Sequence, residues 1–206
     1  MMSIRMVKTM KTKIFIWLIL MLILNACADQ QAEVKFYGAL NRENLEELEL
    51  DLGTVDEYEE VSNFILNKVC DDKFPILSFK VNEVNYKIAP IDFCGGLKWN
   101  PPLRELMFFN ESNMIEKSGK LYPLDSIQSL FQKDFFNTEN HPDFTSDPNR
   151  LCLIIKQKKD SPVENLITVL KRIVISYEEL NSSARLNILL VHPPPPPPIE
   201  INERDN

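Results

Sequence analysis

Five glycines, two histidines and no apolar run longer than eleven residues limit what this 206-residue chain can be. No GxSxG, HExxH, GxxxxGK[ST] or GxGxxG segment is present, so the common nucleophile, zinc and phosphate-binding motifs are excluded. Histidine is the commonest acid–base residue near neutral pH. Here His192 abuts a proline run and His141 lies in a polar loop. We therefore expect a non-catalytic protein with no cofactor and no metal site.

Basic residues are scarce beyond the N-terminus. Residues 27–206 carry nineteen basic and thirty acidic side chains, a net charge of −11. A surface of that sign repels phosphate backbones, so a nucleic-acid partner is not expected. Hydrophobic residues make up 44% of the chain, enough to build a core and to exclude disorder throughout.

The first 26 residues have the three-part layout of an export signal. Four cationic residues precede the apolar run Ile14–Leu24, and Asn25-Ala26 then lead to Cys27. Eleven residues span about 16 Å as a helix, roughly half of a bilayer's hydrocarbon thickness. Such a segment is too short for a comfortable membrane span and suits the core of a signal peptide.

Leu24-Asn25-Ala26-Cys27 resembles the lipobox of bacterial lipoproteins. The resemblance implies that residues 1–26 are removed and that Cys27 is lipidated and becomes the mature N-terminus. Two or more acyl chains attach a protein stably to a membrane. The expected location is therefore the cell envelope, with the folded part facing the periplasm or the cell surface. The alternative is an uncleaved signal anchor with Cys27 as an incidental thiol.

Hydrophobic patterning predicts an α+β protein with small mixed sheets, helices packed on one face and two sub-domains. Breaks at Cys94-Gly95-Gly96 and Pro101-Pro102 suggest the boundary between the sub-domains. The predicted organisation is a signal peptide (1–26), a tether (27–32), a small α+β unit (33–100), an α/β unit (101–191) and a polyproline tail (192–206).

In the first unit, alternation around Val34–Phe36 and Leu48–Leu52 predicts two strands about a turn at Asn41–Asn44. Thr54 and Glu57 have capping-box spacing and predict a helix over 55–70. A hairpin is expected over 76–88, with Asn82-Glu83 as its turn.

In the second unit, strands are expected at 103–109 and 114–122, the latter turning at Ser118-Gly119. Asp125 is the predicted N-cap of a helix ending near Phe135, and Ser161 that of a longer helix ending near Leu180. The apolar run Leu151–Ile155 predicts a strand at the centre of a sheet, and Leu186–Val191 a last strand.

This second unit resembles the periplasmic domain of the ExbD/TolR family of biopolymer-transport proteins. The likeness lies in Glu105–Asn110, Gly119–Leu130, Leu151–Lys156 and Ser161–Leu180. It implies a non-catalytic domain that can form a homodimer beside a proton-driven motor. The family's transmembrane helix carries an acidic residue for proton coupling, and residues 14–26 contain none. A motor role is therefore not carried over, and a scaffold or interaction module remains.

Three further features have two interpretations each. Cys70 and Cys94 could pair, whereas Cys152 lies in an apolar run and is expected in the core. The loop around His141 could hold a cation or be a solvated turn. Nine acids between Glu43 and Glu60 could bind calcium or a basic partner, or form a solvated surface.

The leading hypothesis is a lipid-anchored envelope protein that binds another envelope protein. The alternatives are an accessory lipoprotein for a small ligand or cation, and a lipid-anchored hydrolase that uses carboxylates.

Overall fold

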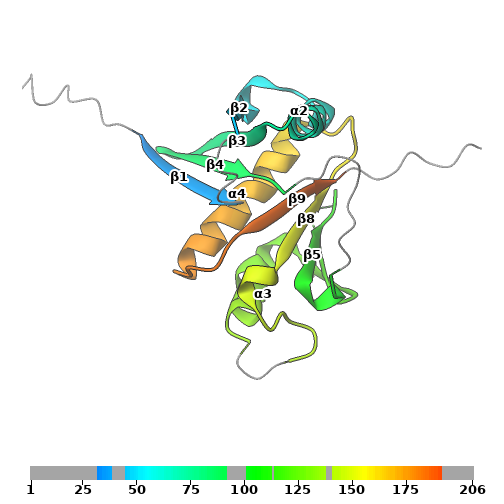
Figure 1. The fold of residues 1–206 in the computed structure, drawn as a ribbon. Helices are drawn as coiled ribbons and strands as arrows, with labels where there is room; N and C mark the ends of the chain where they lie inside the picture. Colours follow the sequence, from blue (N-terminus) through cyan, green and yellow to red (C-terminus); the bar gives the residue numbers. More distant parts are fainter. Residues whose placement is uncertain (1–31, 39–44, 92–100, 113, 138–140, 192–206) are drawn as a thin grey trace, which may run out of the picture. The chain divides into compact units, whose positions relative to one another are not determined.

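The structure is a computed structural model that describes residues 32–38, 45–91, 101–112, 114–137 and 141–191. The described residues have an α+β fold with two mixed sheets, of four and five strands, and three α-helices (Figure 1), which confirms the predicted class. The described residues from Val34 onward belong to one compact unit, and the contacts discussed below lie within it.

The four-stranded sheet has the order β1-β4-β3-β2. β2 and β3 are parallel because helix α2 connects them, and β3 and β4 form the predicted hairpin. The first two predicted strands exist, but they do not pair with each other, because β1 and β2 lie at opposite edges of the sheet. The turn expected at Asn41–Asn44 lies outside the described residues. The elements are β1 (Glu33–Gly38), β2 (Glu47–Asp51), α2 (Tyr58–Cys70), β3 (Phe74–Val81) and β4 (Val84–Ala89).

Helix α2 begins three residues later than predicted, and Thr54 does not cap it. Thr54 lies in a 3₁₀ turn over Leu52–Thr54, and its hydroxyl donates to the Asp51 carbonyl at 2.7 Å. The first helical amide, that of Tyr58, donates instead to the Ser161 carbonyl at 2.9 Å. The start of α2 thus moves to Glu57, which forms a capping box with Glu60, and a distant backbone segment satisfies the Tyr58 amide.

The five-stranded sheet has the order β7-β6-β5-β8-β9. β8 lies between two parallel neighbours and is buried on both faces, as its unbroken apolar sequence predicted. The first strand starts at Leu106, after a 3₁₀ turn over Leu103–Glu105. The strands are β5 (Leu106–Phe109), β6 (Met114–Lys117), β7 (Lys120–Pro123), β8 (Cys152–Lys156) and β9 (Asn187–Val191).

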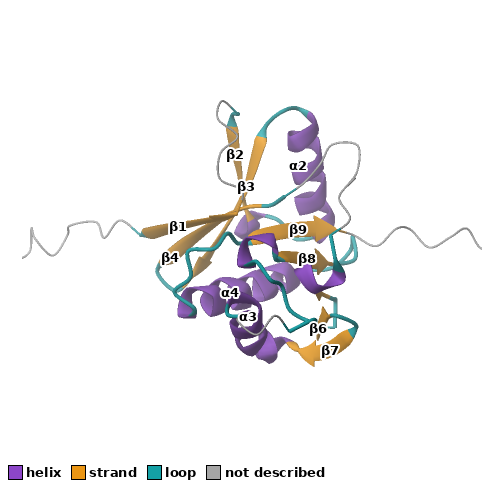
Figure 2. Ribbon diagram, turned by 60° about the horizontal axis from the view of Figure 1, so that its bottom comes forward, coloured by secondary structure: helices purple, strands orange, loops and turns teal. Residues whose placement is uncertain are grey.

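Helices α3 (Ile127–Phe135) and α4 (Val163–Glu179) pack together on one side of this sheet (Figure 2). Both predicted caps are wrong. Asp125 lies within a 3₁₀ turn and forms an ion pair with Arg172 at 3.1 Å. Ser161 makes no side-chain cap, and the first amide of α4, that of Val163, donates to the Asp56 carbonyl at 2.9 Å.

The main hydrophobic core contains residues of both sheets. α2, α3 and α4 all contribute to it, through Val61, Phe131 and Leu170 among others. The predicted sub-domain boundary near residue 100 falls in the segment 92–100, outside the described residues. The signal peptide, residues 27–31 of the tether and the polyproline tail lie outside them too.

Candidate functional site

Cys27, the predicted lipidation site, lies outside the described residues. Within the described residues, none of the helices is both long and apolar enough to cross a membrane.

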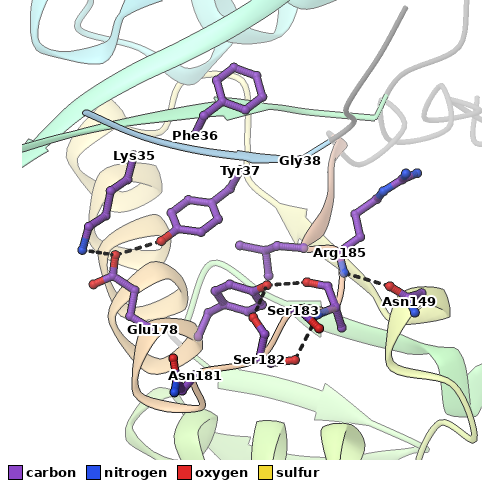
Figure 3. Close-up of a pocket in the computed structure, with 13 residues that line it drawn as sticks. Lys35, Phe36, Tyr37, Gly38, Asn149, Glu178, Asn181, Ser182, Ser183 and Arg185 are labelled. Carbon is purple, nitrogen blue, oxygen red and sulfur yellow. Dashed lines mark hydrogen bonds and ion pairs between the residues drawn. The ribbon is translucent and has the colours of Figure 1, made fainter. Parts of the chain in front are cut away.

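A pocket of about 600 Å³ lies between strand β1 and the loop that leads from α4 into β9 (Figure 3). One wall is Lys35–Gly38, and the other is Asn181–Leu186. Tyr177, Glu178 and Asn149 complete its lining. Its volume is within the range of ordinary ligand sites.

Glu178 is the carboxylate of this pocket, and three side chains hold it. Its Oε1 accepts from the Tyr37 hydroxyl and pairs with Lys35 Nζ, both at 2.8 Å, and its Oε2 accepts from the Tyr86 hydroxyl at 3.1 Å. Burial opposes the ionisation of Glu178, but hydrogen bonds from Lys35, Tyr37 and Tyr86 outweigh it and hold the Glu178 pKa below its usual value. Burial, and then the hydrogen bond to Glu178, raise the pKa of the Tyr37 phenol.

Stacked aromatic rings support the same residues. Tyr37 stacks on Tyr86 with ring centroids 6.2 Å apart and meets Tyr177 edge-on at 5.4 Å. The Tyr177 hydroxyl donates to the carbonyls of Ser182 and Ala184. The aromatic cluster therefore joins β1 to the loop across the pocket.

The loop 181–186 is held by its own polar contacts. Ser182 Oγ accepts from the Ala184 amide at 3.1 Å, and Asn149 Oδ1 accepts from the Arg185 amide at 3.0 Å. The Arg185 side chain is exposed, and its guanidinium makes no ion pair or hydrogen bond within the described part of the chain.

This arrangement suits binding better than proton transfer. The oxygens of Glu178 are occupied by donors, so the carboxylate orders the pocket wall and its lowered pKa keeps it ionised. Arg185 and the polar groups of the loop are the ones that face solvent. No sequence pattern could have indicated the site, because Tyr37 and Glu178 are 141 residues apart.

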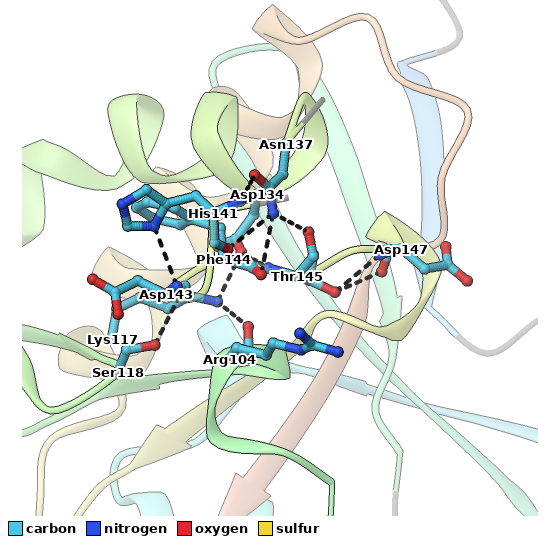
Figure 4. Close-up of polar contacts among 10 residues, drawn as sticks. All are labelled: Arg104, Lys117, Ser118, Asp134, Asn137, His141, Asp143, Phe144, Thr145 and Asp147. Atoms are coloured by element: carbon cyan, nitrogen blue, oxygen red, sulfur yellow. Dashed lines mark hydrogen bonds and ion pairs between the residues drawn. The ribbon is translucent and has the colours of Figure 1, made fainter. Parts of the chain in front are cut away.

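The loop around His141 is a hydrogen-bonded turn in the described residues (Figure 4). Asn137 Nδ2 donates to the carbonyls of His141, Phe144 and Thr145, and His141 Nδ1 accepts from the Asp143 amide at 3.2 Å. No group of three or more His, Cys, Asp or Glu side chains able to hold a metal occurs among the residues that the structure describes.

A buried ion pair beneath this loop was not anticipated from the sequence. Lys117 Nζ lies 2.8 Å from Asp134 Oδ1, and the two side chains are 1% and 0% exposed. Lys117 also donates to the Arg104 carbonyl at 2.7 Å, and Asp134 accepts from the Thr145 amide at 2.8 Å. Burial is the main cause that lowers the pKa of Lys117 and raises that of Asp134. The pair therefore anchors the loop to strand β6.

The acidic run forms surface ion pairs. Glu46, Glu49 and Glu59 pair with Lys73, Lys87 and Lys159 respectively. Glu43 lies outside the described residues. Three of the nine acids in the run thus pair with the molecule's own lysines.

The cysteines differ in their state. Cys70 is disulfide-bonded, and Cys94, the partner considered for it, lies outside the described residues. Cys152 is free and buried, as predicted, and burial raises its thiol pKa to about 12. That thiol is therefore a core side chain.

Comparisons with protein-family models, curated proteins and solved structures give no match to this chain. The resemblance to the ExbD/TolR domain stays a prediction.

Proposed function

We propose that this chain is a lipid-anchored cell-envelope protein that acts as a non-catalytic scaffold by binding another envelope protein. The observation that carries the proposal is the order of the leader: four cations, an eleven-residue apolar run, and then Leu24-Asn25-Ala26-Cys27. Lipid on Cys27 would hold residues 34–191 at a membrane surface outside the cytosol.

The structure supports the binding part of this proposal. The walls of the open pocket beside β1 are joined by hydrogen bonds, and Lys35, Tyr37 and Tyr86 occupy its carboxylate. A pre-formed surface of this kind loses little conformational freedom when a partner binds.

The test is a Cys27→Ser variant expressed beside the parent protein. We expect the parent to fractionate with membranes and to begin at Cys27 with a mass increase from lipid. The variant should keep its leader, lack the added mass and no longer be processed. A Cys152→Ser variant is the matched control, because Cys152 is buried in β8 and should leave processing unchanged.

Chemical crosslinking in intact envelopes then tests the scaffold role. We expect the parent to crosslink to another envelope protein. An unlipidated parent protein with an intact leader would contradict the anchoring proposal, and a parent that crosslinks to no protein would contradict the scaffold proposal.

A further inference from the structure

Three of the four sheet edges among the described residues carry features that block strand pairing. β2 carries Glu47, Glu49 and Asp51, which are exposed. β7 has four residues and includes Lys120 and Pro123. β9 is already met by the segment after β4, because the Ile91 amide donates to the Ile188 carbonyl at 2.7 Å. Charge, proline, short length and covering segments are the usual protections of an edge strand.

β1 is the fourth edge, and no other described strand pairs with its outer side. It has an exposed charge only at its first residue, Glu33, and Val34–Gly38 contain one charged side chain and no proline. Its lysine, Lys35, points toward α4 and pairs with Glu178, while Phe36 points to the opposite side (Figure 3). Val34 and Phe36 are apolar and are 57% and 37% exposed. An incoming strand would therefore meet apolar side chains on one face of β1.

The pocket is a groove along this same strand, since four consecutive residues of β1 line it. Its charged lining residues are Lys35, Glu178 and Arg185, a net charge of +1. Lys35 and Glu178 neutralise each other, so the positive charge is that of exposed Arg185. This sign is opposite to the −11 of residues 27–206. The groove favours a partner group that carries negative charge.

We propose that the groove binds an extended peptide segment of a partner protein, which adds as a strand beside β1 and places a carboxylate against Arg185. This inference rests on the proposed scaffold function and identifies its docking site. In strand addition, main-chain hydrogen bonds supply affinity and side-chain pockets supply specificity. Here the exposed apolar face of β1 and Arg185 supply the selectivity.

The test begins with a displayed library of random linear peptides selected on the full-length protein in detergent micelles. We expect the selected peptides to carry an Asp, a Glu or a free C-terminal carboxylate next to alternating apolar residues. A synthetic selected peptide should slow amide hydrogen exchange in β1, because strand addition gives its backbone new hydrogen bonds. Arg185→Glu should weaken its binding at least about tenfold.

Matched variants separate the groove from general charge effects. Arg104→Glu reverses an exposed arginine elsewhere and should leave binding unchanged. Phe36→Lys should abolish strand addition, whereas Leu121→Lys on the β7 edge should not. A peptide with Lys in place of its acidic residue should bind Arg185→Glu better than it binds the parent. Circular dichroism shows that each variant is folded.

Several outcomes would overturn the inference. These are slowed exchange at another edge, equal losses for Arg104→Glu and Arg185→Glu, or β1 crosslinked to a second copy of the chain. If no linear peptide binds but an envelope protein still crosslinks to the full-length chain, strand addition is wrong and the proposed function stands. If neither binds, both are wrong.

Discussion

The stability of the fold should depend strongly on the buried ion pair between Lys117 and Asp134. Both charges are removed from solvent, and each has one further hydrogen bond, to the Arg104 carbonyl and from the Thr145 amide. Removing one partner of such a pair leaves an uncompensated buried charge. Exposed ion pairs such as Lys158–Glu111 are screened by water and hold their partners weakly.

We therefore expect Asp134→Ala to lower the free energy of unfolding by about 3–5 kcal/mol, measured by urea denaturation. The double variant Lys117→Met, Asp134→Leu should recover most of this loss, because no buried charge remains. Lys158→Ala is the control and should change the unfolding midpoint little. An Asp134→Ala protein as stable as the parent would contradict the burial of this pair.

Glu178 should make the stability of the fold depend on pH. Its pKa lies below that of an unfolded glutamate, about 4.3, because of its hydrogen-bond donors, so the folded state binds the proton less readily. Its contribution to stability is fully present above that unfolded pKa and is lost as the pH falls through the lower folded value.

Unfolding experiments between about pH 6 and pH 3 test this sign, since the unfolded glutamate titrates within that range. The parent should lose stability toward the acid end, and Glu178→Gln should flatten that slope while lowering stability near neutral pH. Glu116→Gln, on a β6 carboxylate for which no partner is found among the described residues, is the control. If stability falls equally steeply with pH in the parent and in Glu178→Gln, the three donors do not lower the pKa of Glu178.

At the scale of elements, β1 depends on one glycine. Gly38 has φ +109°, and a Cβ there would lie 2.1 Å from the Ala89 carbonyl oxygen of β4. Neither strand can accept that atom without backbone movement. Gly119, in the β6–β7 turn, also has positive φ, at +76°, but a Cβ there would meet open space.

We expect Gly38→Ala to loosen β1 from β4, seen as faster hydrogen exchange in β1 and a lower melting temperature. Gly119→Ala should lower the free energy of unfolding only by the backbone strain, about 1–2 kcal/mol, and leave hydrogen exchange in β1 unchanged. If both variants lost the same stability and exchanged alike, the close approach of Gly38 to Ala89 would be wrong.

At the scale of the whole molecule, the two predicted units share interior and backbone contacts. The Tyr58 amide donates to the Ser161 carbonyl and the Val163 amide to the Asp56 carbonyl, so α2 and α4 begin on each other's preceding segments. The main core includes Ile65 of α2 and Leu166 of α4.

We therefore expect residues 34–191 to unfold in a single cooperative transition. Hydrogen exchange followed by mass spectrometry in increasing urea should give the same opening free energy for α2 and α4. Val163→Pro, which removes the donor to Asp56, should lower both values together. Two separate transitions would instead support independently stable sub-domains.

Local sequence patterns determined most of the elements. The alternation of 76–88 predicted the β3–β4 hairpin, the apolar run 151–155 the central strand, and helical spacing the faces of α3 and α4. These predictions succeeded because periodicity reflects which side chains must leave water. The likeness of Leu24–Cys27 to a lipobox is likewise a matter of local sequence, and it remains a prediction.

Only the tertiary structure decided the helix starts, the strand neighbours and the pocket. Thr54 and Ser161 have the spacing of N-caps, but other groups bind the amides that they would have served. The Asp56 and Glu57 amides donate to the Glu60 carboxylate, and the Val163 amide donates to the distant Asp56 carbonyl. Lys117 meets Asp134 from a different element, and Tyr37 meets Glu178 across 141 residues of chain. Contacts between distant residues depend on how sheets and helices pack, which short-range periodicity does not encode.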